Sequence, residues 1–210
     1  MSGSRTTLAG RLARLGFADA ARAEQLLLTD LGGIGPDGAE TDPATDPLLT
    51  ALAAAADPDL ALTGLARVFG GTDDPPALRQ ALRDEPDFRD RLTAVLGVSA
   101  GLADHLARHP DDAQILRGAL GRPSPAELRE QMLQAVGANP RLAEPIAGQD
   151  DKDPVAALAA AYRRRLLHLA ARDMTAVVTV EEVVEELADI AAAVLEAALA
   201  VARSELPAGP

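Results

Sequence analysis

Two of the three histidines could share a metal ion. His105 and His109 lie four residues apart, the spacing that places two imidazoles on one face of a helix for zinc. However, Pro110 disfavours helical backbone at His109, and the chain has no cysteine to complete such a site. Only His168 offers another imidazole, and nothing marks which carboxylates could serve instead. We therefore interpret the pair as the polar end of a helix, where the negative dipole favours a histidine.

Two Asp-x-Asp triplets could hold magnesium for phosphoryl or nucleotidyl transfer: Asp57-Pro58-Asp59 and Asp151-Lys152-Asp153. In nucleotidyltransferases such a pair lies on a strand that follows a glycine-rich helix start. Here both triplets lie at Asp-Pro steps with no strand pattern nearby. Since aspartate before proline is typical of a helix start, we interpret both as helix caps.

The remaining chemistry-bearing patterns are weaker. The adjacent glycines Gly32-Gly33 and Gly70-Gly71 lack the Lys-Ser/Thr of a phosphate loop and predict turns. The run Arg163-Arg164-Arg165 would fan out around a helix, so an anion or partner contact there is the less favoured alternative. No Gly-x-Ser-x-Gly occurs. From these patterns we assign no catalytic, cofactor-binding or metal-binding residue.

Composition predicts an all-α fold. The 210 residues are 48% hydrophobic and only 2% aromatic, and they include 45 alanines and no tryptophan. Alanine and leucine favour helices, whereas strand-favouring residues are sparse. The net charge of −12 excludes a nucleic-acid platform, which needs a basic surface. Such acidity favours a well-solvated surface, with a basic protein partner as the alternative.

No segment resembles a signal peptide or a membrane span. The N-terminus has arginines but no apolar run of the required length, and Ile190 to Ala202 is short and interrupted by Glu196. The absence of cysteine excludes disulfides. We expect a cytoplasmic protein.

Start and stop signals predict eleven helices. Asp-Pro steps mark several starts, and Ser124 to Glu127 and Thr179 to Glu182 form capping boxes. The predicted ranges are Thr6–Leu15, Asp19–Leu28, Pro47–Ala56, Pro58–Phe69, Pro75–Arg83, Asp87–Leu96, Ala100–Arg108, Asp111–Leu120, Pro125–Val136, Pro154–Met174 and Val180–Glu205. Left-handed glycine caps are expected at Gly16, Gly70, Gly97, Gly121 and Gly137.

These helices predict two domains. Residues 1–121 form an irregular bundle of short helices with a flexible linker at about 30–46, and residues 124–210 contain longer helices. A second Pro- and Gly-rich stretch, Asn139 to Asp153, also resembles a linker. The last two helices should pair antiparallel.

Periodicity predicts which faces of the last two helices are buried. On the first, an apolar stripe runs through Val155, Leu158, Tyr162, Leu166 and Leu169, with Arg163, Arg164 and Arg172 pointing elsewhere. On the second, the stripe runs through Val180, Val183, Leu187, Ile190 or Ala191, Val194, Ala198 and Val201.

The amino-acid sequences of several segments resemble those of one protein family. Leu92 to Ser99 and Leu102 to Pro110 are similar to the N-terminal region of the bifunctional glutamine synthetase adenylyltransferase, also called the adenylyl-removing enzyme. The same region is matched, in order and in register, by Arg11–Phe17, Asp57–Leu65, Tyr162–Asp173 and Glu186–Leu195.

The resemblance implies a long protein with two nucleotidyltransferase halves, which remove and attach AMP on glutamine synthetase using magnesium and ATP. The family's Gly-Lys-x-Gly, Glu-Leu-Asn and Ser-Asp-x-Asp block is not found in these 210 residues. We therefore expect a non-catalytic helical segment (a fragment or a shortened gene product) that needs no cofactor itself.

The expected partners are glutamine synthetase or a nucleotidyltransferase domain, with self-association through uncovered apolar helix faces. The alternative is a free-standing helical interaction module with no link to adenylylation.

Overall fold

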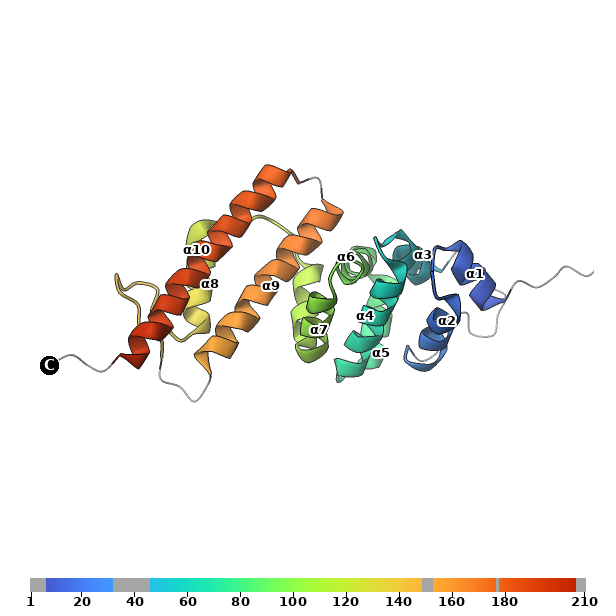
Figure 1. Cartoon of the computed structure of the whole chain (residues 1–210), viewed down its shortest axis with the longest axis horizontal. Coiled ribbons are helices and arrows are strands. Elements are labelled where there is room, and N and C mark those ends of the chain that lie inside the picture. The colour runs from blue at the N-terminus through green and yellow to red at the C-terminus, as the bar shows by residue number, and fades with distance from the viewer. Residues whose placement is uncertain (1–6, 32–45, 149–152, 177, 207–210) are drawn as a thin grey trace, which may run out of the picture. The chain divides into compact units, whose positions relative to one another are not determined.

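The computed structural model describes residues 7–31, 46–148, 153–176 and 178–206. In these ranges the chain forms eleven helices and no strand, which confirms the all-α prediction (Figure 1). Its contacts divide it into two compact units, residues 1–118 and 119–210.

Unit 1 is built around one central helix. Helix α4 (Pro58–Gly71) packs on α7 (Ala100–Arg108) and α6 (Pro86–Leu96), and also contacts α2 (Ala20–Thr29) and α3 (Pro47–Ala54). The outer elements are α1 (Leu8–Arg14), α5 (Pro75–Asp84) and the 3-10 helix η2 (Pro110–Arg117). Leucines dominate the core, together with Phe17, Phe69 and Phe88.

Unit 2 is a three-helix bundle. Helix α8 (Pro125–Ala135) lies against α10 (Val180–Glu205), and α9 (Pro154–Thr175) packs on both. Leu128, Met132 and Leu133 of α8 meet Leu158 and Leu169 of α9, whereas α10 contributes mostly alanines. Because alanine side chains are short, the helix axes can approach closely. The core between these long helices is therefore thin.

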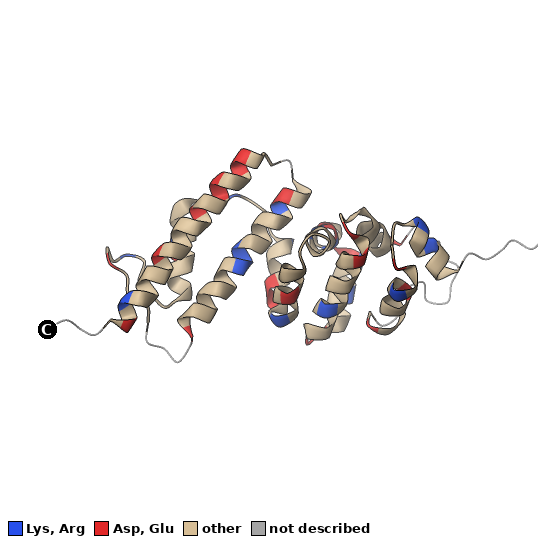
Figure 2. Cartoon of the chain, in the orientation of Figure 1, with Lys and Arg blue, Asp and Glu red and all other residues tan. Residues whose placement is uncertain are grey.

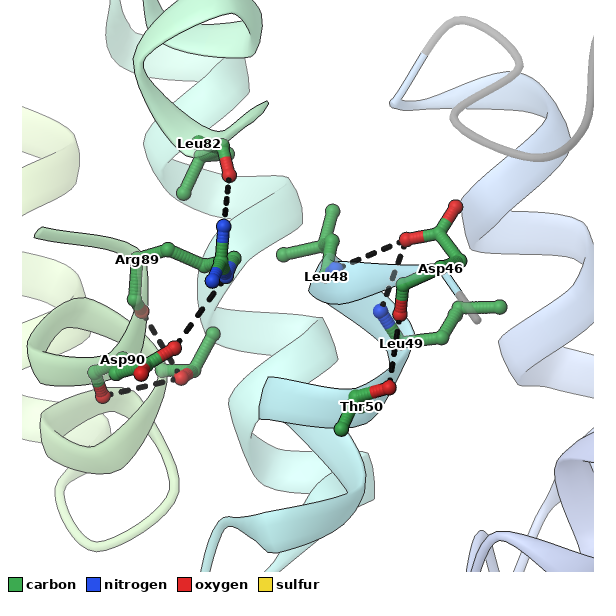
Figure 3. A network of polar contacts seen from close by, with 8 residues as sticks. Asp46, Leu48, Leu49, Thr50, Leu82, Arg89 and Asp90 are labelled. Carbon is green, nitrogen blue, oxygen red and sulfur yellow. Dashed lines mark hydrogen bonds and ion pairs between the residues drawn. The ribbon is translucent and has the colours of Figure 1, made fainter. Parts of the chain in front are cut away.

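Local capping sets most helix starts, as predicted. The carboxylates of Asp46, Asp57, Asp74 and Asp153 accept hydrogen bonds from amides of the first helical turns. Both capping boxes, at Ser124 and Thr179, form with bonds in both directions. Figure 3 shows Asp46 holding the amides of Leu48 and Leu49 at 2.9 and 3.2 Å. Most of the predicted 30–46 linker, including its Asp42-Pro43 step, lies outside the described residues.

Some backbone predictions were wrong. Residues 110–117 form a 3-10 helix rather than an α-helix over Asp111–Leu120. Among the described residues only Gly16 and Gly137 have positive φ; Gly97 is right-handed, and Gly70 and Gly71 form the last residues of α4 rather than a turn. Gly121 lies away from any helix end.

The stretch after α8 is anchored over most of its length. The Ala147 amide donates to Ala200 O at 2.9 Å, the Gly148 amide donates to Val136 O at 3.0 Å, and Ala147 is buried. Arg129 of α8 fixes the same loop through Pro140 O at 2.6 Å. The linker prediction for Asn139 to Asp153 is therefore wrong for residues 139–148.

Candidate functional site

His105 lies in the last turn of α7, and His109 directly follows that helix. His109 leaves the helical region at φ −134° and ψ 66°, as the following proline predicts. His105 is fully buried, and its Nε2 lies 2.8 Å from Asp112 Oδ2 in η2. The centroids of the two imidazole rings are 4.8 Å apart, and the ring planes are tilted by 38°. This arrangement fastens η2 to α7.

The carboxylates of the first Asp-x-Asp triplet accept hydrogen bonds from the backbone. Asp57 Oδ1 accepts from the Leu60 amide at 2.9 Å and caps α4. Asp59 does not cap its own helix: its two carboxylate oxygens accept from the amides of Ala18 and Asp19 at 2.7 and 3.2 Å. It thereby ties α4 to the start of α2. Three of the four carboxylate oxygens of the pair therefore accept hydrogen bonds from backbone amides, and the helix-cap interpretation holds for Asp57 but not for Asp59.

The second triplet is only partly described, because Asp151 and Lys152 fall outside the described residues. Asp153 caps α9, accepting from the amides of Val155 and Ala156 at 2.9 and 3.2 Å. Within the described ranges, no three His, Asp or Glu side chains come together in a group that could hold a metal ion.

A polar hollow of about 510 Å³ lies in unit 1 between the end of α4 and the start of η2. Its lining is rich in aspartates, and Arg108 and His109 complete it. Two of the aspartates already have structural bonds, Asp74 to the Ala77 amide and Asp112 to His105. The hollow therefore resembles a solvated junction of helix ends more than a binding site.

The arginine run on α9 splits between solvent and interior. Arg163 and Arg164 are exposed. Arg165 is partly buried, and burial followed by the neighbouring charge of Arg164 lowers the pKa of its guanidinium. The three side chains therefore do not form one basic patch.

The most unusual polar group in unit 2 is a buried ion pair that periodicity did not predict. Arg172 of α9 donates from Nη2 to Glu186 Oε2 of α10, and the two residues are only 8% and 1% exposed. The prediction that Arg172 points away from the packed face was wrong. Burial raises the pKa of the Glu186 carboxyl, and the positive charge of Arg172 opposes that rise.

His168 lies one helical turn before Arg172 and is also buried. Burial, followed by the charges of Arg165 and Arg172, lowers the pKa of its imidazole. Neither His168 Nδ1 nor Arg172 Nε has a hydrogen-bond partner within the described residues. Both atoms are buried in packed protein. The positive charges of Arg165 and Arg172 favour the neutral form of the His168 imidazole.

Two further arginines link α8 and its preceding loop to α10. Arg122 reaches Glu185 and Asp189 at 2.7 and 2.8 Å. Arg129 binds Glu196 through both carboxylate oxygens, with the shortest contact at 2.6 Å. Their acidic partners, at spacings of four and seven residues, lie along one edge of α10, so these pairs fix the rotation of α10 against α8. Figure 2 shows this concentration of acidic residues along α10.

No helix among the described residues is both long and apolar enough to cross a membrane. Asp57, Asp59, His105 and Arg172 thus each take part in a cap, a clamp between helices or an ion pair.

The model of the glutamate-ammonia ligase adenylyltransferase family matches residues 89–208. The chain belongs to this family. The resemblance read from the sequence is thus confirmed, and the matched range includes η2, the whole of unit 2's helical bundle and most of α6.

Relatives match far beyond that range. The bifunctional glutamine synthetase adenylyltransferase/adenylyl-removing enzyme of Streptomyces avermitilis is 41% identical over 210 residues, which is 98% of this chain and 19% of that protein. The enzyme of the same name from Streptomyces coelicolor is also 41% identical, over 209 residues, and that from Leifsonia xyli subsp. xyli is 38% identical over 200. The chain therefore spans about a fifth of the length of these relatives. No solved structure matches it.

Proposed function

We propose that the chain is a non-catalytic helical segment of a glutamine synthetase adenylyltransferase-like protein, acting as a scaffold or docking part. The observation that carries the proposal is the 41% identity along 98% of the chain, combined with the use of its carboxylates in caps and ion pairs. A segment preserved along its whole length without a free catalytic constellation supports a positioning role.

The partners that suit this role are a nucleotidyltransferase domain of the same family and glutamine synthetase, in the cytoplasm. Magnesium and ATP would act in the nucleotidyltransferase domains. The residues of this chain would contribute binding surface and orientation only.

Binding and transfer assays test the proposal together. The probes are glutamine synthetase of Streptomyces avermitilis and the part of that organism's adenylyltransferase outside the matched region. We expect the purified chain to bind at least one of them in titration calorimetry. With magnesium, radiolabelled ATP and glutamine synthetase, the chain alone should transfer no AMP.

Two results would count against the proposal. AMP transfer by the chain alone, lost in Asp57→Asn or Asp59→Asn, would make it an enzyme. Failure to bind either probe would remove the docking role and favour the alternative, a free-standing helical interaction module. Exposed large apolar side chains on α10, such as Leu195 at 71% exposure, are the observation that keeps this alternative in view.

A further inference from the structure

Helix α10 carries a second apolar face in addition to the one it buries in unit 2. Its core face runs through Ile190, Ala193, Ala197 and Val201. About 150° around the helix lie four large apolar side chains that are 41–71% exposed: Val184, Leu187, Leu195 and Leu199. Four exposed alanines fill the positions between them: Ala188, Ala191, Ala198 and Ala202. We call these eight residues the outer stripe.

The spacing of the outer stripe indicates what kind of element would cover it. Starting at Val184, the central positions recur at alternating steps of four and three residues, through Leu195 and on to Ala202. This is a repeat of 3.5 residues, the period at which two helices run side by side with a small crossing angle. A helix lying along α10 is therefore the occupant that this spacing favours.

The stripe is also complementary to itself. When the sequence is reversed about Ala193, each of the eight positions falls on another member of the stripe. An antiparallel copy with its two-fold axis at Ala193 thus places Leu195 against Ala191 and Val184 against Ala202. Leu187 falls opposite Leu199, and Ala188 falls opposite Ala198. Val184 and Leu195 thus each meet an alanine, which lets the helices pack closely, and Leu187 and Leu199 form a leucine pair on the same face.

Charge follows the same symmetry. Glu181, Glu185 and Arg203 lie on one edge of the outer stripe. In the antiparallel copy, Arg203 falls at the level between Glu181 and Glu185. Glu185 keeps 66% of its side chain exposed even though it bonds Arg122, so it remains accessible to a second cation.

We propose that the outer stripe is the contact surface of an antiparallel dimer formed by two copies of this chain. Helix α10 has 26 residues and is therefore about 39 Å long. A seam about 10 Å wide buries roughly 400 Å² on each copy, which is at the small end of specific interfaces. The dimer is accordingly weak and reversible, with a dissociation constant on the order of 10–100 μM.

Sedimentation velocity of the full chain between about 2 and 200 μM tests the dimer. The average mass should rise with concentration for the native chain and stay at that of the monomer for Leu195→Glu. Leu28→Glu is the matched control, because Leu28 of α2 is a leucine with 55% exposure outside the stripe. The control should dimerise like the native chain, and all three should have the same far-UV circular dichroism.

Cysteine crosslinking tests the antiparallel register, since the native chain contains no cysteine. Ala188→Cys mixed with Ala198→Cys should form a disulfide-linked dimer under mild oxidation. Either variant alone should not, because its two cysteines lie ten residues, about 15 Å, apart along the seam. Glu181→Arg should weaken the dimer about three- to tenfold by opposing Arg203.

Three results would overturn the proposal. The first is a native chain that stays monomeric at the highest concentration. This includes a monomer whose outer stripe binds the rest of the relatives' polypeptide instead of a second copy. The second is a dimer that Leu195→Glu leaves intact. The third is crosslinking of Ala188→Cys with itself, which would indicate a parallel arrangement. The proposed docking function fails by a different result, loss of binding to the two probes, so the two failures are distinguishable.

Discussion

Gly71 is the position at which a single methyl group should disturb unit 1 most. It is the last residue of α4 and lies against the end of α7, the helix with which α4 makes its most extensive contact. A Cβ atom at Gly71 would lie 1.9 Å from Ala107 O, 2.7 Å from its carbonyl carbon and 3.0 Å from its Cα. All three are backbone atoms, so no side-chain rotation can relieve the overlap. Gly71→Ala must therefore push the last turn of α7 away from α4.

The size of the effect follows from that overlap. An ordinary Cβ contact begins at 3.4 Å, so α7 must retreat by about 1.5 Å. Overpacking of this kind costs about 1–3 kcal/mol of unfolding free energy. Gly70 supplies the matched control, because a Cβ there meets nothing within 4 Å. Gly70→Ala should be neutral or stabilise α4 by up to about 1 kcal/mol through helix propensity.

Urea unfolding followed by far-UV circular dichroism measures the difference. With a slope of about 2 kcal/mol/M, a loss of 2 kcal/mol lowers the midpoint of the unit 1 transition by about 1 M. Gly70→Ala should leave that midpoint unchanged or raise it slightly. Equal midpoints for the two variants would show that α4 and α7 do not approach closely at Gly71.

The buried ion pair gives a second prediction. Arg172→Met should destabilise unit 2 by about 3–5 kcal/mol in urea unfolding, because Glu186 loses its cation in the interior, and adding Glu186→Leu should restore most of that loss. Recovery by the double variant separates this cause from lost packing. His105→Leu should cost about 1–3 kcal/mol in the same assay, since it removes the buried imidazole that Asp112 binds, and an unchanged midpoint would count against the clamp. A pH series tests His168, whose pKa is lowered in the folded state. The unfolded chain binds the proton more tightly, so stability should fall as pH drops below about 6.5, and the native chain should fall more steeply than His168→Gln. Parallel curves for these two proteins would show that His168 is not held neutral.

Helix starts were predictable because their determinants are local. The Leu60 amide donates a hydrogen bond to Asp57, and reciprocal bonds form at Ser124 and Thr179. Each of these bonds joins residues three positions apart. Such geometry is encoded in a short window of sequence and is independent of the rest of the fold.

The buried face of α10 was predicted only in part, for a reason that concerns its neighbours. Apolar periodicity assigned Val180, Leu187 and Ala198 to the core, yet all three are exposed, and Ala193, Ala197 and Ala200 are buried instead. Hydropathy ranks leucine and valine above alanine, but α8 lies close enough to α10 that alanine is the better fit. Both faces of α10 are apolar, so periodicity alone could not separate the core face from the outer stripe.

Long-range polar pairs could not be predicted from the sequence, for a related reason. Glu186 occupies a core position of α10 only because Arg172 of α9 comes to meet it, and Asp59 leaves its own helix cap to bind amides some forty residues earlier. Each pairing depends on how two separate elements pack, which no single window of residues specifies.

These pairings also bear on what the chain can do. A carboxylate that accepts backbone amides through both of its oxygens, as Asp59 does, is held in one orientation by the fold. Asp59, His105 and Glu186 fix α2 on α4, η2 on α7 and α10 on α9, respectively. Among its exposed charged residues, unit 2 also presents apolar surface on the outer stripe of α10. An exposed apolar stripe with this spacing is the surface that the proposed antiparallel dimer would bury.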